Sequence, residues 1–267
     1  MDRQIIRWMS QHSNFTPRGL KKCNWVGWDD WNRAGLPAWE ATKGCTAVGK
    51  HSDKAREVLL DAAEELFARH GIDAVSNRRI AEHAGTANHS AVAYHFGDRD
   101  ELLRLLLTRH QPEMNRRRME RAAALPEDAE VRDLLACMVL PWIEYLASRP
   151  VPSWHARFLF QVQSIPSMSE ILKSATVNNT EIESLIQRLQ KALSHLPEQV
   201  VKGRSMVLGP MVLGISASYE ERIQNGENEP NWAGVGYFFV DSCTGMLTAP
   251  VTHPDDFISF PNTPYLI

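Results

Sequence analysis

Polar side chains that can hydrogen-bond nucleic-acid bases stand together at residues 88–90. This run consists of Asn88, His89 and Ser90, and the small apolar pair Ala91 and Val92 follows it. An asparagine amide matches the adenine edge through two hydrogen bonds, whereas histidine and serine side chains reach either bases or phosphates. A helix that enters the major groove uses short polar residues at its N-terminal end and keeps its inner face apolar. The run therefore indicates a helix that reads DNA bases directly, without giving the base order.

Phosphate contacts are expected on both sides of this run. Tyr94 and His95 follow at the far end of the same helical pattern, and Arg99 stands near the start of the next one. Their hydroxyl, imidazole and guanidinium groups hydrogen-bond phosphate oxygens, as do the free N–H groups of a helix N-terminus. Upstream of the run, Arg78 and Arg79 supply two more cations.

The charge balance sets a condition on this interpretation. Residues 51–110 contain eight Lys/Arg and ten Asp/Glu, and the whole chain has a net charge of -3. DNA binding therefore requires that the cations of this region lie on the DNA side while the carboxylates face away. The cations concerned are Lys54, Arg56, Arg78, Arg79 and Arg99, and the carboxylates are Asp61, Glu64, Glu65 and Glu82.

Three helical patterns position these residues. Apolar residues over 55–67 recur at helical spacing, with Ser52 as a candidate cap and Gly71 as the end of the helix. Ser76 is the candidate cap of a short second helix, and a third is expected over 88–95. Short helices joined by a glycine-bearing turn are typical of a helix-turn-helix.

The rest of the chain is also predicted to be helical. A long helix should begin at the capping box that starts with Asp98 and should bend near Pro112. No alternating strand pattern and no glycine-rich phosphate-binding fingerprint occurs further on, so the fold class is all-α. The five further helical patterns cover 131–148, 152–164, 168–195, 198–225 and 232–248.

Three motifs within residues 52–107 carry a family resemblance. They read Ala62-Ala63-x-x-Leu66-Phe67-x-x-x-Gly71, Ser76-x-Arg78-x-Ile80-Ala81-x-x-Ala84-Gly85 and Tyr94-His95-Phe96-Gly97-x-Arg99-x-x-Leu102. Together they resemble the DNA-binding domain of tetracycline-repressor-type (TetR family) transcriptional regulators. The resemblance implies that Ser76 caps the second helix, that Tyr94 and His95 touch phosphates, and that a basic residue, usually lysine, occupies the position of Arg99.

The chain departs from the family pattern in two places. Between Gly85 and Tyr94 it has one residue more than the commonest family spacing, which leaves the register of Asn88 against base edges open. Arginine in place of lysine at Arg99 keeps the charge and alters the contact geometry.

The resemblance also implies partners. Family members are all-α homodimers that bind a double-stranded DNA operator, bind a small-molecule effector in a larger second domain, and pair through their last two long helices. For this chain the dimer contact is expected over 198–248. Its candidate core residues, which could equally pack inside one subunit, are Val207, Met211, Phe238, Phe239 and Met246.

An effector pocket is expected among the helices of residues 130–215. Such pockets are mostly apolar, with a few polar groups that orient the ligand, although most aromatic residues in such a region are simply core. The candidate lining residues are Met138, Trp142, Tyr145, Trp154, His155, Phe158 and Gln161.

The predicted domains are a disordered extension over 1–50, a helix-turn-helix domain over 51–110, a ligand-binding and dimerisation domain over 111–248 and an irregular tail over 249–267. The extension contains five of the eight tryptophans without a sustained apolar period. Its alternative role is a basic arm that lies along DNA, because it holds eight Lys/Arg against four Asp/Glu.

Two rival functions are a protein-binding all-α adaptor and an all-α enzyme. No catalytic motif organises the histidines, serines and acid pairs, so no catalytic residue and no cofactor is expected. His83, His89 and His95 recur every six residues and so do not share one helix face, which leaves no expected metal site. No apolar run of about 18 residues or more stands out, so we expect a cytoplasmic protein without a membrane contact.

Overall fold

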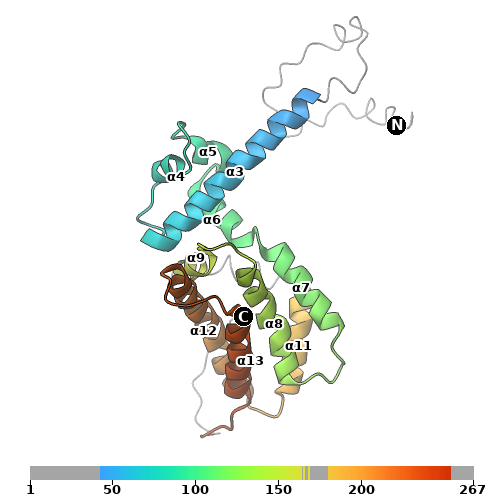
Figure 1. Cartoon of the computed structure of the whole chain (residues 1–267). Coiled ribbons are helices and arrows are strands. Elements are labelled where there is room, and N and C mark those ends of the chain that lie inside the picture. The colour runs from blue at the N-terminus through green and yellow to red at the C-terminus, as the bar shows by residue number, and fades with distance from the viewer. Residues whose placement is uncertain (1–42, 164, 166–167, 169–179, 254–267) are drawn as a thin grey trace, which may run out of the picture. The chain divides into compact units, whose positions relative to one another are not determined.

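The computed structural model describes residues 43–163, 165, 168 and 180–253. Its helices follow one another along the chain without a strand among the described residues, which confirms the predicted all-α class (Figure 1). Residues 53–267 group as one compact unit. The helices are α3 (Lys43–His70), α4 (Asn77–His83), α5 (Ala91–Phe96), α6 (Arg99–Thr108), α7 (Gln111–Ala123), α8 (Val131–Ala147), α9 (His155–Val162), α11 (Thr180–Ala192), α12 (Glu198–Gln224) and α13 (Trp232–Thr248).

The first described helix begins earlier than the sequence indicated. Helix α3 starts at Lys43, so Ser52 lies inside it and the prediction that Ser52 caps it was wrong. The predicted extension over 1–50 falls outside the described residues except for the start of this helix. The expected end of α3 is confirmed: Gly71 follows it with a φ of 83°, a conformation that glycine adopts without strain.

The caps of α4 and α6 form as predicted. The Ser76 hydroxyl accepts a hydrogen bond from the N–H of Arg79 at 3.2 Å, and the Asp98 carboxylate accepts one from the N–H of Glu101 at 2.8 Å. Each bond satisfies a backbone donor that the first helical turn leaves unpaired.

The long helix expected from Asp98 is broken rather than bent. Helix α6 ends at Thr108, and α7 begins at Gln111 with Pro112 in its first turn. A proline has no N–H to continue the helix, and its ring clashes with the carbonyl four residues earlier. Arg109 and His110 therefore form a link between two helices.

The C-terminal helices match most of the expected segments. Helices α8, α12 and α13 lie within one residue of the predicted bounds. Helix α9 begins at His155 instead of at residue 152, because Glu220 of α12 caps it: one carboxylate oxygen accepts from the N–H of Ala156 at 3.3 Å and the other from the N–H of Arg157 at 3.1 Å. Of the expected helix over 168–195, the described part is α11.

Helix α8 lies at the centre of the second half of the chain. It contacts α13, α7 and α11, while α9 packs against α12 (Figure 1). At Gly236 of α13 a Cβ atom would stand 2.9 Å from Cδ2 of Leu140 on α8, so the absence of a side chain permits the close approach of the two helices.

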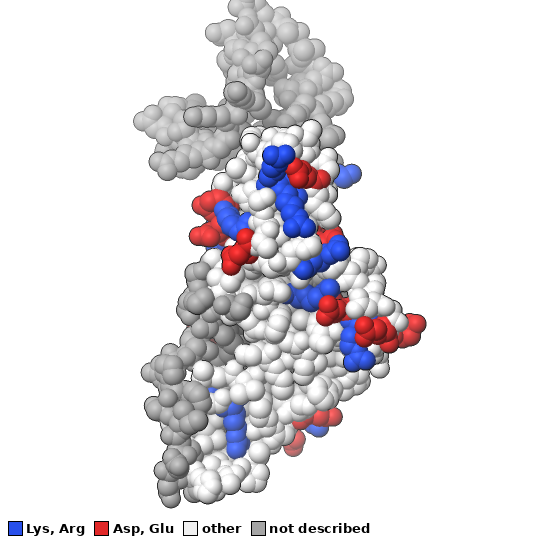
Figure 2. All heavy atoms as spheres, turned by 90° about the vertical axis from the view of Figure 1, so that its left-hand side faces the viewer, with Lys and Arg blue, Asp and Glu red and all other residues white. Residues whose placement is uncertain are grey.

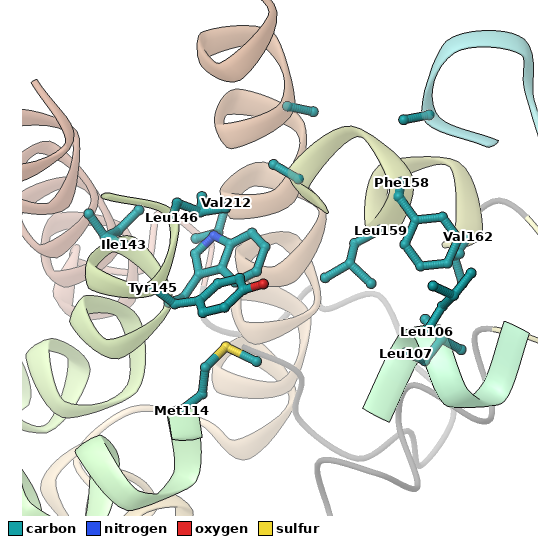
Figure 3. Close-up of a cluster of buried hydrophobic side chains, with 14 of the residues drawn as sticks. Leu106, Leu107, Met114, Ile143, Tyr145, Leu146, Phe158, Leu159, Val162 and Val212 are labelled. Atoms are coloured by element: carbon teal, nitrogen blue, oxygen red, sulfur yellow. The ribbon is translucent and has the colours of Figure 1, made fainter. Parts of the chain in front are cut away.

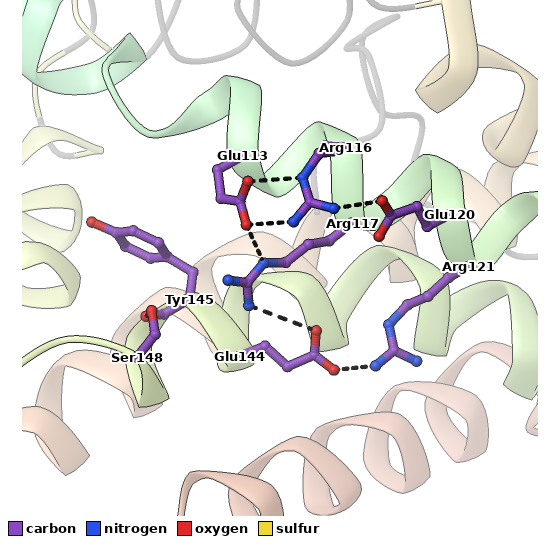
Figure 4. Close-up of polar contacts among 8 residues, drawn as sticks. All are labelled: Glu113, Arg116, Arg117, Glu120, Arg121, Glu144, Tyr145 and Ser148. Carbon is purple, nitrogen blue, oxygen red and sulfur yellow. Dashed lines mark hydrogen bonds and ion pairs between the residues drawn. The ribbon is translucent and has the colours of Figure 1, made fainter.

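One apolar cluster runs from the helix-turn-helix region into the later helices. Figure 3 shows part of it, with Leu106 and Leu107 of α6 on the side of Phe158 and Val162 of α9. Polar contacts add to the packing of α7 on α8, where Arg117 and Arg121 both pair with Glu144 (Figure 4). The helices that follow α6 are therefore packed directly behind the helix-turn-helix.

Candidate nucleic-acid interface and the junction behind it

Helix α5 presents one apolar face to the core and one polar face to solvent. Ala91, Val92 and Phe96 are buried, whereas Tyr94 is 78% exposed, more than any other large apolar side chain described. Its ring meets the ring of His95 edge-on, with 5.0 Å between centroids. The phenol of Tyr94 is therefore accessible from solvent, and its phosphate contact stays a prediction.

The polar run before α5 forms a turn instead of the first turn of the helix. Helix α5 begins at Ala91, so the prediction that it starts at Asn88 was wrong by three residues. The Asn88 side-chain oxygen accepts from the N–H of Ser90 at 3.0 Å, and the Asn88 carbonyl accepts from the N–H of Ala91 at 3.0 Å. This side-chain bond competes with helix formation, which is the usual behaviour of asparagine near helix starts. Asn88, His89 and Ser90 remain exposed.

The two exposed arginines of α4 have different neighbours: Arg79 Nη2 lies 2.9 Å from Nε2 of His70, whereas Arg78 has an acidic partner. Arg78 donates to Glu82 at 2.8 Å, and His89 Nδ1 lies 3.8 Å from the same carboxylate oxygen. The hydrogen bond from Arg78 lowers the pKa of Glu82. The expectation that Glu82 faces away from the cations is therefore wrong. Figure 2, which views the side of the molecule that carries α4 and α5, accordingly shows basic side chains with acidic ones beside them instead of a continuous basic surface.

Arg99 does not join the exposed cations. Its guanidinium donates to the backbone carbonyl of Ile72 and lies over the ring of Phe67, 4.9 Å from the centroid. Burial lowers the pKa of Arg99. The side chain thus holds the start of α6 against the connection between α3 and α4, an arrangement that differs from the phosphate contact expected at this position.

Behind the helix-turn-helix, a polar cluster joins α3 to the later helices. The Glu64 carboxylate on α3 hydrogen-bonds Nδ1 of His155 on α9, and both side chains are buried. Arg109, in the link between α6 and α7, places Nη2 3.3 Å from Glu64 and 2.6 Å from Asp61. Its Nε donates to Nε2 of His110 at 2.5 Å. The sequence had pointed to His155 as a ligand contact and to Asp61 and Glu64 as carboxylates that face away from DNA, whereas Arg109 and His110 carried no expectation.

The protonation of this cluster follows from burial and neighbouring charge. Burial alone raises the pKa of Glu64, but His155 and Arg109 lower it to about 2. Burial, together with the charges of His155 and Arg109, lowers the pKa of His110 to about 3. At neutral pH, Glu64 is therefore a carboxylate and His110 a neutral imidazole.

The predicted effector residues are mostly packed core. Trp142, Tyr145, His155 and Phe158 form one aromatic cluster, in which the ring centroids of Tyr145 and His155 are 5.2 Å apart. Trp142 also donates to the Ser216 hydroxyl at 3.1 Å. The structure thus brings these four residues together with their side chains buried.

The other predicted effector residues lie elsewhere. Met138 lines a hollow of about 10 Å³, the space of a single water molecule. Trp154 is half-buried beneath Arg157, whose guanidinium carbon lies 4.4 Å from the ring centroid, and Gln161 is half-buried on α9. Trp154 and His155 do line a cleft of about 350 Å³ between α3, α4 and the connection from α8 to α9.

The candidate dimer residues divide into two groups. Val207 and Phe238 are half exposed, as is Tyr237, which the sequence analysis did not single out. Phe239 is fully buried inside this chain because α13 turns it toward its own core, so of the two alternatives for this residue the structure supports packing within one subunit. Met211 and Met246 are partly buried against the same core.

Among the described helices, α12 alone is long and apolar enough to cross a membrane by length and composition, which the sequence analysis had not expected. Only 33% of its apolar window is buried in the chain. An apolar face used for packing against protein passes the same test, so this single helix is weak grounds for a membrane span.

The helix-turn-helix region matches a known protein family. Residues 59–106 match the family model described as bacterial regulatory proteins, tetR family. The matched segment runs from Leu59 in α3 to Leu106 in α6 and includes the whole of α4 and α5. No curated protein sequence matches the chain.

Proposed function

Because this chain belongs to the tetR family of regulatory proteins through residues 59–106, we propose that it binds an inverted-repeat DNA operator as a homodimer and regulates transcription from it. The observation that carries the proposal is helix α5, which buries Ala91, Val92 and Phe96 and exposes Tyr94 beside the polar turn of Asn88. Such a helix is anchored from behind and free to enter a major groove. Members of this family are regulators, and the proposed role needs no catalytic residue or cofactor.

The contacts with DNA divide by chemistry. Asn88, His89 and Ser90 reach base edges from the turn that precedes α5, while Tyr94 and His95 bind phosphates. Arg78 and Arg79 on α4 approach the phosphate backbone of DNA. Ser76 stabilises the N-terminus of that helix as its cap. Arg99 acts from inside by fixing α6 and makes no phosphate contact.

The dimer forms through the exposed apolar faces of α12 and α13. Met206, Val207 and Ile215 on α12 and Tyr237 and Phe238 on α13 are between 36% and 67% exposed. Apolar and aromatic side chains of this kind are enriched in the buried centre of subunit interfaces. A two-fold dimer presents two copies of α5, so its operator has two half-sites in inverted orientation. The dimer works in the cytoplasm, where the DNA of a bacterium lies.

A small effector alters operator affinity through the second domain. The cleft of about 350 Å³ gives it a place to enter, since α3 and α4 form one wall and Trp154 and His155 the other. A ligand there touches the DNA-binding helices and the following domain together. Coupling between two such sites is typically about 1 to 3 kcal/mol, or roughly 5- to 150-fold in affinity. Whether the result is repression or activation follows from the position of the operator relative to a promoter.

Selection from a pool of random DNA duplexes tests the proposal. The expected result is an inverted repeat that the protein shifts in a gel with strong salt dependence. An adaptor that binds only proteins predicts no shift at all. Binding to every duplex alike would contradict sequence-specific regulation.

A further inference from the structure

Glu64, His110 and His155 bring three metal-ligating groups to one point. Their donor atoms all lie within 4.8 Å of one another. Glu64 comes from α3, His110 from the link between α6 and α7, and His155 from the first residue of α9. Glu64 is 5% exposed, His155 is 3% exposed, and His110 is partly buried. Convergence of three donors from three separate elements in the interior is more specific than a cluster of acids on a surface.

Two more polar groups beside these donors are buried without a hydrogen-bond partner among the described residues. They are the hydroxyl of Tyr145 and Nη1 of Arg109. The Tyr145 ring packs against both imidazoles, with centroids 4.9 Å from His110 and 5.2 Å from His155. Because buried polar groups in proteins are nearly always paired, these two groups indicate that the cluster accommodates a polar occupant.

We propose that Glu64, His110 and His155 bind one divalent transition-metal ion of the zinc type. Two imidazoles and one carboxylate are a preferred ligand set for zinc, whereas magnesium and calcium favour oxygen ligands alone. Three protein ligands leave a fourth position of the tetrahedron open. A water molecule bound there would have the Tyr145 hydroxyl close by as a hydrogen-bond partner.

Arg109 competes with the ion for the same ligands. Its Nη2 lies 3.3 Å from Glu64 Oε2, and its Nε donates to His110 at 2.5 Å, so one cation already contacts two of the three ligands. The same Nη2 lies 2.6 Å from Asp61, which is outside the ligand set. Metal binding therefore releases Arg109 from Glu64 and His110 and leaves it paired with Asp61.

The location gives the ion a regulatory effect, and this consequence rests on the proposed function. Glu64 lies within the segment that matches the DNA-binding family, while His155 belongs to the following domain. An ion held by both fixes the position of α3 relative to α9. Because α3 supports α4 and α5, metal occupancy is expected to change operator affinity.

Metal titration of the metal-free full chain tests the site without any DNA. Zn²⁺ is added in competition with a chromophoric chelator, and Co²⁺ is used in parallel for its visible absorption. The expected result is one ion per chain, with cobalt absorption typical of a tetrahedral site. His110→Ala should weaken zinc binding by more than about 100-fold, since even loss of a residue that only supports a ligand costs about 10- to 100-fold. Arg109→Gln should strengthen it, because the competing charge is removed.

The control is His195→Gln, a histidine on the surface and outside the cluster. Its zinc affinity should equal that of the wild type. Unfolding temperatures measured with chelator show whether each variant is folded. Glu64→Gln, which keeps the side-chain shape, replaces His110→Ala if that variant does not fold. In the wild type, added zinc should raise the unfolding temperature, and in His110→Ala or Glu64→Gln it should not.

Three outcomes overturn the metal site. They are no zinc binding by the wild type, equal affinity in the wild type and His110→Ala, and weaker binding in Arg109→Gln. The first of these would mean that water alone satisfies the buried groups. Failure of the proposed function looks different: zinc would bind with the expected variant pattern, and no operator would be recovered.

Discussion

The guanidinium of Arg99 donates a hydrogen bond to the backbone carbonyl of Ile72, 27 residues earlier in the chain. The same group covers the ring of Phe67, so the first residue of α6 is fixed to α3 and to the connection that follows α3. A cation expected at the DNA surface therefore holds together the helices that support α5. From this geometry we expect Arg99 to affect the stability of the fold and Tyr94 to affect DNA binding.

Arg99→Ala should lower the stability of the helix-turn-helix, whereas Tyr94→Phe should not. Loss of a hydrogen bond from a charged group costs about 1.5 to 3 kcal/mol, while the Tyr94 hydroxyl belongs to an exposed side chain. Tyr94→Phe should instead weaken operator binding by about 2- to 10-fold, the value of one hydrogen bond, and equally for all sequences. Thermal unfolding and gel shifts on both variants give the comparison. Unchanged stability in Arg99→Ala would show that the contact with Ile72 contributes nothing.

Asn88→Ala should change the base preference at one position of each half-site. Loss of an asparagine that reads a base costs about 1 to 3 kcal/mol of binding free energy and relaxes the base preference at that position. The turn itself also depends on Asn88, whose side-chain oxygen accepts from the N–H of Ser90. Asn88→Asp serves as the control for the turn, because it keeps this acceptor. Since it also replaces the amide donor by a negative charge, it should weaken operator binding while the turn is retained. If Asn88→Ala weakens binding to every sequence by the same factor, Asn88 positions the turn and reads no base.

A charge at Phe238 should separate the dimer. Phe238 is 51% exposed on α13, so Phe238→Glu leaves the core of the subunit intact and places a carboxylate in the apolar contact. Sedimentation should show folded monomers that have lost operator binding. Val151→Glu is the matched control, because Val151 is 59% exposed on the connection from α8 to α9. A Phe238→Glu protein that sediments as a dimer would remove this face of α13 from the interface.

The ion pairs of Glu113 should contribute stability that depends on pH. Hydrogen bonds from Arg116 and Arg117 lower the pKa of Glu113 to about 2 (Figure 4). A carboxyl with a lowered pKa stabilises the folded state fully above its ordinary value of 4.5, and this contribution disappears as the pH falls toward 2. Glu113→Gln should therefore flatten the pH dependence of unfolding between those values. Glu127→Gln, which removes an exposed carboxyl elsewhere, is the control, and the same flattening in both variants would contradict the assignment to Glu113.

Gly236→Val should destabilise the packing of α13 on α8. Its Cβ would already stand 2.9 Å from Leu140 and 3.3 Å from Ile143, and the added methyl groups increase the overlap. Overpacking of this kind costs about 1 to 3 kcal/mol. Gly245→Val, on the same helix with no neighbouring atom within 4 Å, should change the unfolding free energy by less than about 0.5 kcal/mol. If the two substitutions lower the unfolding free energy equally in denaturant unfolding, the close approach of α13 and α8 at Gly236 does not contribute to stability.

The sequence by itself determined the features that depend on residues close together in the chain. The caps at Ser76 and Asp98, the glycine turn at Gly71 and most helix bounds follow from contacts within about four residues. The three motifs between Ala62 and Leu102 indicated the family. Where a local rule failed, as at Asn88, a side-chain bond to the backbone had displaced the helix start by three residues.

Only the tertiary structure decided which side chains meet. Arg99 and Phe239 point inward because neighbouring helices offer them a carbonyl, a ring or a core, and no spacing in the sequence encodes that choice. Glu64, His110 and His155 come together although about 45 residues separate each from the next, because α3, the link after α6 and α9 pack at one place. Helical periodicity gives the direction of a side chain around its own axis. The neighbour that it finds there depends on how the helices pack against one another.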